Sequence, residues 1–216
     1  MINTQPAATA AFTSSVLKDE DLLTPCLGDP TVVLTTVPRD EIAAEPTPEE
    51  EAALEQRLLS IVKKLKSNYS ARGELIEVYT QLGRLYVVAE RYERAMRVLL
   101  EALELSQSTY GKEHPNCADI FVELGFIQFK KGQYEFARTY LTPALSIYEE
   151  NYGKVSDPVA LVLHKLGRAC EALGDLASAE ANYQRSVTIL QNTFNEDDSQ
   201  ILIARNDLAR VRAAQQ

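Results

Sequence analysis

Residues 110–125 read YGKEHPNCADIFVELG, and residues 152–167 read YGKVSDPVALVLHKLG. Both stretches begin with Tyr-Gly-Lys, carry a proline in the middle and end on Leu-Gly. Phe194-Asn195-Glu196 falls at the same interval again. A period of about 42 residues indicates stacked supersecondary units. The positions that align at this period are Leu82, Leu124, Leu166 and Leu208; Gly83, Gly125, Gly167 and Ala209; and Ala95, Ala137 and Ala179.

Each unit is predicted to consist of two antiparallel helices. The first helices are expected at 71–88, 115–131, 158–173 and 199–213, and the second helices at 92–108, 134–150 and 176–192. Gly132 and Gly174 are expected to end first helices in a left-handed conformation, whereas the first unit has Glu90-Arg91 at that turn. Gly125 and Ala137 leave room for the two helices of a unit to approach closely. The last helix is expected to turn Ile201, Ala204 and Leu208 inward and Arg205, Asp207 and Arg212 outward, which would cap the array.

The chain divides into three parts. Residues 1–46 are rich in Ala, Thr, Pro and acidic residues without a sustained period, which predicts a disordered acidic tail. Residues 47–67 are expected to form an N-terminal capping helix, begun by Thr47, Pro48 and Glu50. Residues 68–216 hold the repeats, at 68–109, 110–151 and 152–193, with a terminal half repeat at 194–216.

Composition excludes several classes of function. The formal net charge is -9, and residues 1–51 carry -8 of it, so the repeats lack the basic surface that nucleic acids require. No secretion signal and no membrane-spanning apolar run is evident, which predicts a cytoplasmic protein. The cysteines at 26, 117 and 170 are scattered and odd in number, which is typical of free thiols in a reducing compartment.

The sequence contains no pattern typical of an enzyme. His114 lies three residues before Cys117 near a helix start, where a thiolate would be favoured, but a turn residue and a passive thiol are the simpler interpretation. No zinc-ligand spacing, phosphate loop or nucleophile elbow occurs. We therefore expect no catalytic residues, no metal and no cofactor.

The repeat residues resemble the tetratricopeptide repeat (TPR) family. Its pattern of large residues, Leu-Gly and spaced alanines is matched by Tyr79, Leu82-Gly83, Tyr86, Ala95, Leu99 and Ala102. The usual TPR period is about 34 residues, and the longer period found here is similar to that of the kinesin-light-chain subtype. The resemblance implies an all-α, right-handed superhelical solenoid. The chain differs from the light chains at Gln81, Glu123 and Lys165, where they have asparagine. It also lacks the carboxylate clamp of chaperone-tail-binding TPRs, whose places are taken by Thr80, Arg84, Glu123 and Leu161.

The resemblance further implies a scaffold that binds a peptide or protein segment in its concave groove. First helices line that groove in the family, so their non-packing positions are the candidate binding residues. These are Glu77, Thr80 and Arg84 in the first unit, Asp119, Val122, Glu123, Phe126 and Lys130 in the second, Leu161, His164, Lys165 and Arg168 in the third, and Asn206 and Arg210 in the last helix. Acids dominate one end and bases the other, with Phe126 between them as either a packing residue or a ligand anchor.

An alternative is a non-catalytic subunit of an enzyme or regulatory complex. Asp19-Glu20-Asp21-Leu22-Leu23 sets an acidic cluster beside leucines, and it is interpreted either as part of a solubilising tail or as a docking or autoinhibitory motif. We expect no nucleic-acid or membrane partner, and the partner's identity and the oligomeric state stay open.

Overall fold

The computed structural model describes residues 48–193 and 198–216. The predicted disordered tail at 1–46, its Asp19–Leu23 motif and the helix cap at Thr47 lie outside these residues. Within them the chain forms helices and no strand. The helices are α1 (Pro48–Leu65), the short 3₁₀ helix η3 (Tyr69–Ala71), α2 (Arg72–Val88), α3 (Tyr92–Tyr110), α4 (Pro115–Lys130), α5 (Tyr134–Tyr152), α6 (Asp157–Ala172), α7 (Leu176–Thr193) and α8 (Ser199–Ala214).

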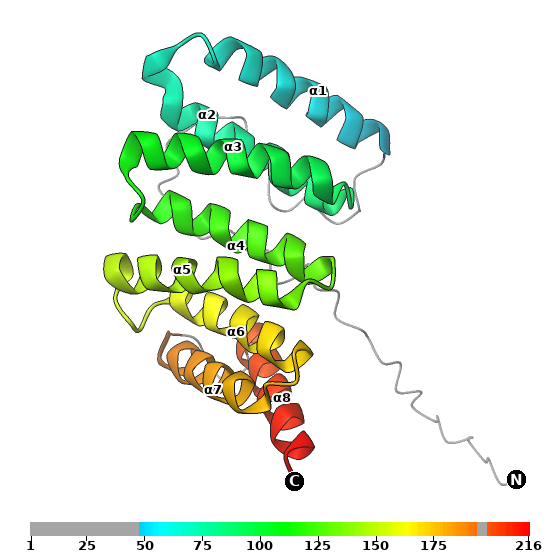
Figure 1. The fold of residues 1–216 in the computed structure, drawn as a ribbon, viewed down its shortest axis with the longest axis vertical. Helices are drawn as coiled ribbons and strands as arrows, with labels where there is room; N and C mark the ends of the chain where they lie inside the picture. Colours follow the sequence, from blue (N-terminus) through cyan, green and yellow to red (C-terminus); the bar gives the residue numbers. More distant parts are fainter. Residues whose placement is uncertain (1–47, 194–197) are drawn as a thin grey trace, which may run out of the picture.

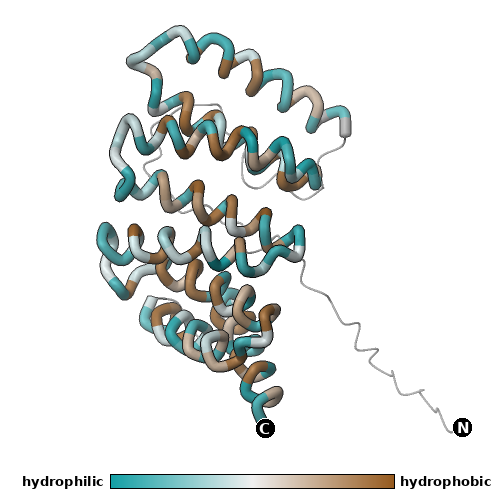
Figure 2. The backbone as a smooth tube through the Cα atoms, in the orientation of Figure 1, coloured by the Kyte–Doolittle hydropathy of each residue, from teal (hydrophilic) through white to brown (hydrophobic). Residues whose placement is uncertain are grey.

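The helices stack in chain order into a solenoid. Figure 1 shows them layered from α1 at one end to α7 and α8 at the other. The closest packing is within the pairs α2–α3, α4–α5 and α6–α7, which are the helix pairs expected from the repeat. Hydrophobic and hydrophilic residues alternate along the helices in Figure 2, because each helix has one face against its neighbours and one toward solvent. The all-α solenoid of antiparallel helix pairs is thereby confirmed for the described residues.

The turns within the three pairs close in the same way, although their residues differ. Gly132 and Gly174 have φ values of 72° and 77°, and Glu90 adopts the left-handed conformation too, with φ 55°. In each turn the next residue donates its N–H to a carbonyl five residues back, as in Arg91 N to Tyr86 O at 2.7 Å. The first unit therefore has the same turn as the others, with a residue that tolerates this conformation less well than glycine.

The recurring Leu-Gly pair has a packing cause within each unit. A Cβ atom placed on Gly125 of α4 would lie 2.8 Å from Cγ of Leu141 on α5 and 3.4 Å from the carbonyl oxygen of Ala137. Leu124, directly before the glycine, is fully buried. Ala209 holds the corresponding place in α8 and is exposed, because no described helix follows α8 to cover it. The glycine is thus required where a second helix packs on the first.

Both ends of the solenoid are covered by amphipathic helices. Leu58 and Val62 of α1 are buried, and Ile201, Ala204 and Leu208 of α8 are buried as expected. Arg212 is exposed, but the expectation that Asp207 points outward is wrong, since its side chain is only 13% exposed. Asp207 lies against α6, where it pairs with a histidine described below.

Candidate protein-binding face

The predicted binding residues come from α2, α4, α6 and α8, the first helices of successive units. Helix α2 contacts α4, and α4 contacts α6, so these helices lie on one side of the solenoid, here called the first-helix face. Exposed members are Glu77, Lys130, Asn206 and Arg210, and partly exposed members are Arg84, Asp119, Leu161 and Arg168. Buried members are Thr80, Val122, Glu123, Phe126, His164 and Lys165.

The expectation that all these positions are free of packing was therefore too broad. Thr80, for example, is buried and donates its hydroxyl hydrogen bond to the carbonyl of Ile76, one turn earlier in the same helix, at 2.9 Å. Position along a helix gives the direction of a side chain. It does not give the depth to which the next unit covers that side chain.

The N-terminal part of the first-helix face is acidic and internally paired. Arg84 Nε of α2 donates to Glu123 Oε1 of α4 at 2.7 Å, and the Glu123 side chain is only 9% exposed. Asp119, one turn before Glu123, accepts a hydrogen bond from the hydroxyl of Tyr148 on α5. Burial raises the pKa of Asp119, and the Tyr148 hydroxyl and the Arg84 guanidinium oppose that rise. These groups satisfy one another inside the solenoid.

The central part of the face combines aromatic rings with cations. Lys165 Nζ of α6 lies 5.1 Å from the ring centroid of Phe126 on α4, and Lys130 Nζ lies 5.5 Å from it. Arg168 lies over Phe129 at 4.7 Å. A small depression between α4 and α6 is lined by both rings, by Lys165 and Arg168, and by Gly125 and Leu141. Phe129 and Leu141 were not predicted as site residues, although Phe129 lies only three residues after Phe126 on the same helix.

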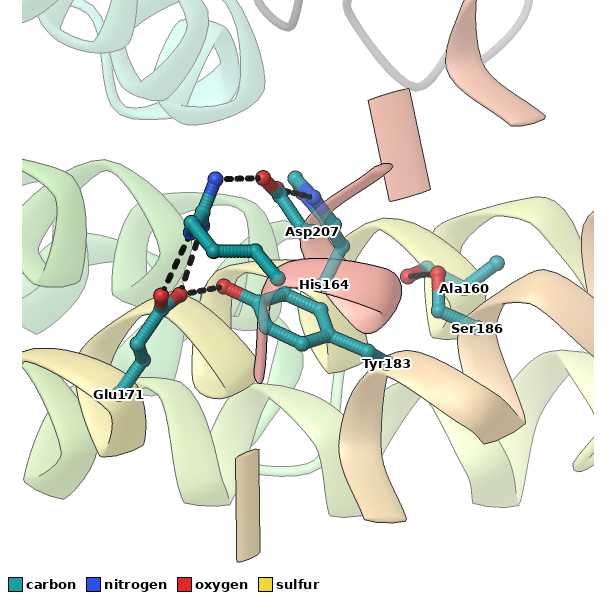
Figure 3. Close-up of polar contacts among 7 residues, drawn as sticks. Ala160, His164, Glu171, Tyr183, Ser186 and Asp207 are labelled. Carbon is teal, nitrogen blue, oxygen red and sulfur yellow. Dashed lines mark hydrogen bonds and ion pairs between the residues drawn. The ribbon is translucent and has the colours of Figure 1, made fainter. Parts of the chain in front are cut away.

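The C-terminal part of the face is a hydrogen-bonded network between three helices. His164 Nε2 of α6 lies 2.7 Å from Asp207 Oδ2 of α8. Arg210 of α8 donates to both carboxylate oxygens of Glu171 on α6, at 2.7 and 2.8 Å, and also pairs with Asp207. Tyr183 of α7 donates to Glu171 at 2.9 Å. Figure 3 shows these side chains converging, with Ser186 donating separately to the carbonyl of Ala160 at 2.8 Å.

Groups of this network have shifted pKa values. The hydrogen bonds from Arg210 are the main cause that lowers the pKa of Glu171, and burial raises the pKa of Tyr183. Arg210 was expected to be a cation of the groove, and the structure places its guanidinium between two carboxylates. Sequence reasoning missed Glu171 and Tyr183, because their partners lie in other helices of the array.

The described residues hold no group of three or more His, Cys, Asp or Glu side chains that could bind a metal ion. Cys117 is fully buried, and burial raises the pKa of its thiol, so its place near a helix start does not produce a thiolate. His114 caps α4 by accepting from the backbone N–H of Asn116 at 3.2 Å. Among the helices described here, none is long and apolar enough to cross a membrane.

Comparison with known proteins extends these observations. A family model described as tetratricopeptide repeat matches residues 74–150, 117–192 and 158–216. No curated protein matches the chain. The fold is similar to that of a Podosopora anserina putative kinesin light chain with nearly identical TPR-like repeats, at 20% identity, 77% and 80% coverage of the two chains and a TM-score of 0.65.

Two further solved structures share the fold. BtubC (BKLC) from P. vanneervenii is 21% identical, with 78% and 76% coverage and a TM-score of 0.62. The first TPR of Spaghetti (RPAP3), bound to the HSP90 peptide SRMEEVD, is 16% identical, with 65% and 92% coverage and a TM-score of 0.50.

Proposed function

The chain belongs to the tetratricopeptide repeat family, and we propose that it is a scaffold or adaptor whose first-helix face binds a segment of another protein. Repeats of this family are interaction modules that are in general non-catalytic, and the RPAP3 domain with the same fold holds a peptide. The two described cysteines are buried free thiols, which agrees with a reducing compartment such as the cytoplasm.

The observation that carries the proposal is the aromatic and cationic centre of the face. Aromatic and arginine side chains dominate the binding energy of protein interfaces. Phe126 and Phe129 line one depression with Lys165 and Arg168, so apolar and cationic groups lie side by side there. The segment that fits best is an extended or helical peptide with an apolar residue near Phe126 and acidic residues toward Lys165 and Arg168.

Arg210 is a further cation of this face. It already shares hydrogen bonds with Glu171 and Asp207, so an acidic ligand would have to compete with two carboxylates of the chain itself. The acidic segment at 19–23 has the composition of the proposed ligand and would compete for the same site as an autoinhibitory motif. Deletion of residues 1–46 would then increase affinity for a partner.

The test begins with the full-length chain as bait, to capture and identify a partner from a cell extract. Calorimetric titration then compares the affinity of the parent with Phe126→Ala and Arg168→Glu, after circular dichroism has shown that both fold. We expect each substitution to weaken binding about ten-fold or more. Matched controls are Phe136→Ala and Arg97→Glu, at exposed positions on the second helices α5 and α3, which should bind as the parent does. Unchanged affinity in the two folded test variants would place the site elsewhere.

A further inference from the structure

A cavity lies outside the first-helix face, at the edge of the solenoid where α5 passes into α6 (Figure 1). Its volume is about 490 Å³, which is within the range of ligand sites in proteins. The lining comes from the end of α5, the loop that follows and the C-terminal half of α7, and consists of Glu149, Lys154, Val155, Arg185, Thr188 and Ile189. We call this site the edge cavity. None of its residues is among the predicted binding residues.

One wall of the edge cavity is a close ion pair between two second helices. Arg185 Nη2 of α7 lies 2.5 Å from Glu149 Oε1 of α5, and it also donates to the carbonyl oxygen of Lys154 at 3.3 Å. These contacts hold the guanidinium at the cavity. A guanidinium has five N–H donors in a fixed plane, so Arg185 can keep both contacts and still donate to a ligand.

The charge and the apolar surface of the lining define the ligand that fits. Two cations and one carboxylate give the lining a net charge of +1, in a chain whose net charge is -9. Val155 of the loop is 65% exposed, whereas Ile189 of α7 is buried. An aliphatic group placed against Val155 would remove apolar surface from water. The edge cavity therefore combines an aliphatic surface with a cationic rim.

The preceding unit shows which of these features are specific to this junction. One repeat earlier, the counterparts of Lys154, Val155 and Arg185 are Lys112, Glu113 and Pro143. The lysine of the Tyr-Gly-Lys repeat is thus common to both loops. The α3–α4 loop, on the same edge of the solenoid in Figure 1, has a carboxylate in place of the aliphatic side chain. Its neighbouring helix has no guanidinium at the matching position.

We propose that the edge cavity is a docking site for a segment of a partner protein in which an aliphatic residue stands next to an acidic one. The aliphatic side chain packs against Val155 and Ile189, and the carboxylate accepts charge-assisted hydrogen bonds from Lys154 and Arg185. The ion pair with Arg185 reduces the repulsion between Glu149 and the incoming carboxylate. The site lies on second helices and a loop, so it gives the scaffold a contact that does not depend on the first-helix face.

The test is a titration of the ¹⁵N-labelled full-length chain with a short peptide, followed by the NMR chemical shifts of the backbone amides. The probe is acetylated and amidated Leu-Glu-Leu, and the matched uncharged probe is Leu-Gln-Leu. We expect the acidic peptide to shift the amides of Val155, Thr188 and Ile189. Loss of the hydrogen bonds to a charged group should make the glutamine peptide bind about ten-fold more weakly.

Variants of the lining separate the edge cavity from other sites. Val155→Glu copies the residue of the preceding loop and places a carboxylate beside the ligand, and Arg185→Gln removes the guanidinium. Each should weaken binding of the acidic peptide about ten-fold. Val155 is exposed, so Val155→Glu should fold and keeps the test decisive if Arg185→Gln does not fold. Lys112→Gln, in the preceding loop, is the matched control and should bind as the parent does.

Three results would overturn the edge cavity as a docking site. They are equal affinity for the two peptides, unchanged binding by the folded Val155→Glu chain, and the absence of cavity shifts at millimolar peptide. Shifts confined to Phe126, Phe129 and Arg168 would assign the peptide to the first-helix face and would count equally against it. The proposed function is decided separately, by the affinity of Phe126→Ala and Arg168→Glu for a captured partner.

Discussion

Removal of the Arg84 charge is the sharpest test of the paired groups on the first-helix face. Arg84→Met keeps much of the length and the apolar stem of the side chain and removes the guanidinium. Glu123, whose side chain is 9% exposed, then loses the donor that lies 2.7 Å from its carboxylate. Asp119 also loses a favourable charge, because the Arg84 guanidinium opposes the rise of the Asp119 pKa on burial. Two neighbouring carboxyl groups are left in a region with restricted access to water.

The magnitude follows from the burial of the two partners. Breaking a fully buried ion pair costs about 3–5 kcal/mol, since the remaining charge is desolvated without compensation. The Arg84 side chain is 35% exposed, so water can reach part of the site once the guanidinium is gone. We therefore expect Arg84→Met to lower the free energy of unfolding by about 2–3 kcal/mol.

The pair as a whole should matter much less than either partner alone. Arg84→Met/Glu123→Leu removes both charges and fills the site with apolar groups of similar size. Such replacements of ion pairs are often neutral, so the double variant should unfold within about 1 kcal/mol of the parent. The cycle would then give a coupling free energy of about 1 kcal/mol or more, as expected for residues in direct contact.

Equilibrium unfolding in urea, followed by far-ultraviolet circular dichroism, measures the parent, both single variants and the double variant. Arg97→Met is the control, because Arg97 is exposed on α3 and its loss should change the free energy of unfolding by less than about 0.5 kcal/mol. The reasoning is refuted if Arg84→Met is no more harmful than this control. It is refuted equally if the double variant is as unstable as Arg84→Met.

Three further outcomes are expected. Leu124→Ala should cost about 2–5 kcal/mol in urea unfolding, because Leu124 is fully buried, whereas Leu100→Ala, 44% exposed, should cost far less; equal losses would contradict the packing described for α4. Truncation after Thr193, which removes α8, should lower the melting temperature and cause aggregation in light scattering, and a stable monomer would show that α8 is no cap. The pKa of Glu171 is lowered in the folded chain, chiefly by Arg210. The stability that the Glu171 carboxylate contributes is therefore fully present above its unfolded pKa and is lost as the pH falls through its lower folded pKa. Glu171→Gln should therefore lower the free energy of unfolding at neutral pH but not in strong acid. An equal decrease at both pH values would contradict this charge-based explanation.

Local patterns in the sequence were sufficient for the helices. The helix expected at 92–108 runs from Tyr92 to Tyr110, and Pro115 begins α4 as expected. Turn residues, prolines and apolar spacing act within a few residues, so they are visible in one sequence. The turn at Glu90 shows where such local patterns fail, because a glutamate there adopts a left-handed conformation that sequence alone assigns to glycine.

For the binding face, the sequence could predict only the direction in which each side chain of the first helices points. Counting along the first helices placed Phe126, Lys165 and Arg168 on one side of the array, and the structure brings them together with Phe129. The same count treated Thr80, His164 and Lys165 as open positions, and all three are buried. Coverage by the next unit depends on the angle at which two units stack, and no local pattern encodes that angle.

By itself, the sequence determined the repeat, the two helices of each unit and the residues that pack inside a pair, because all of these follow from periodicity within one unit. Only the tertiary structure decided which side chains meet across units, as Arg84 meets Glu123 and Lys165 meets Phe126. Those partners lie about one repeat apart in the chain, and their contact depends on the combined packing of all the helices between them. For the same physical reason Asp207, expected to face solvent, is held against His164 by the way α8 docks on α6.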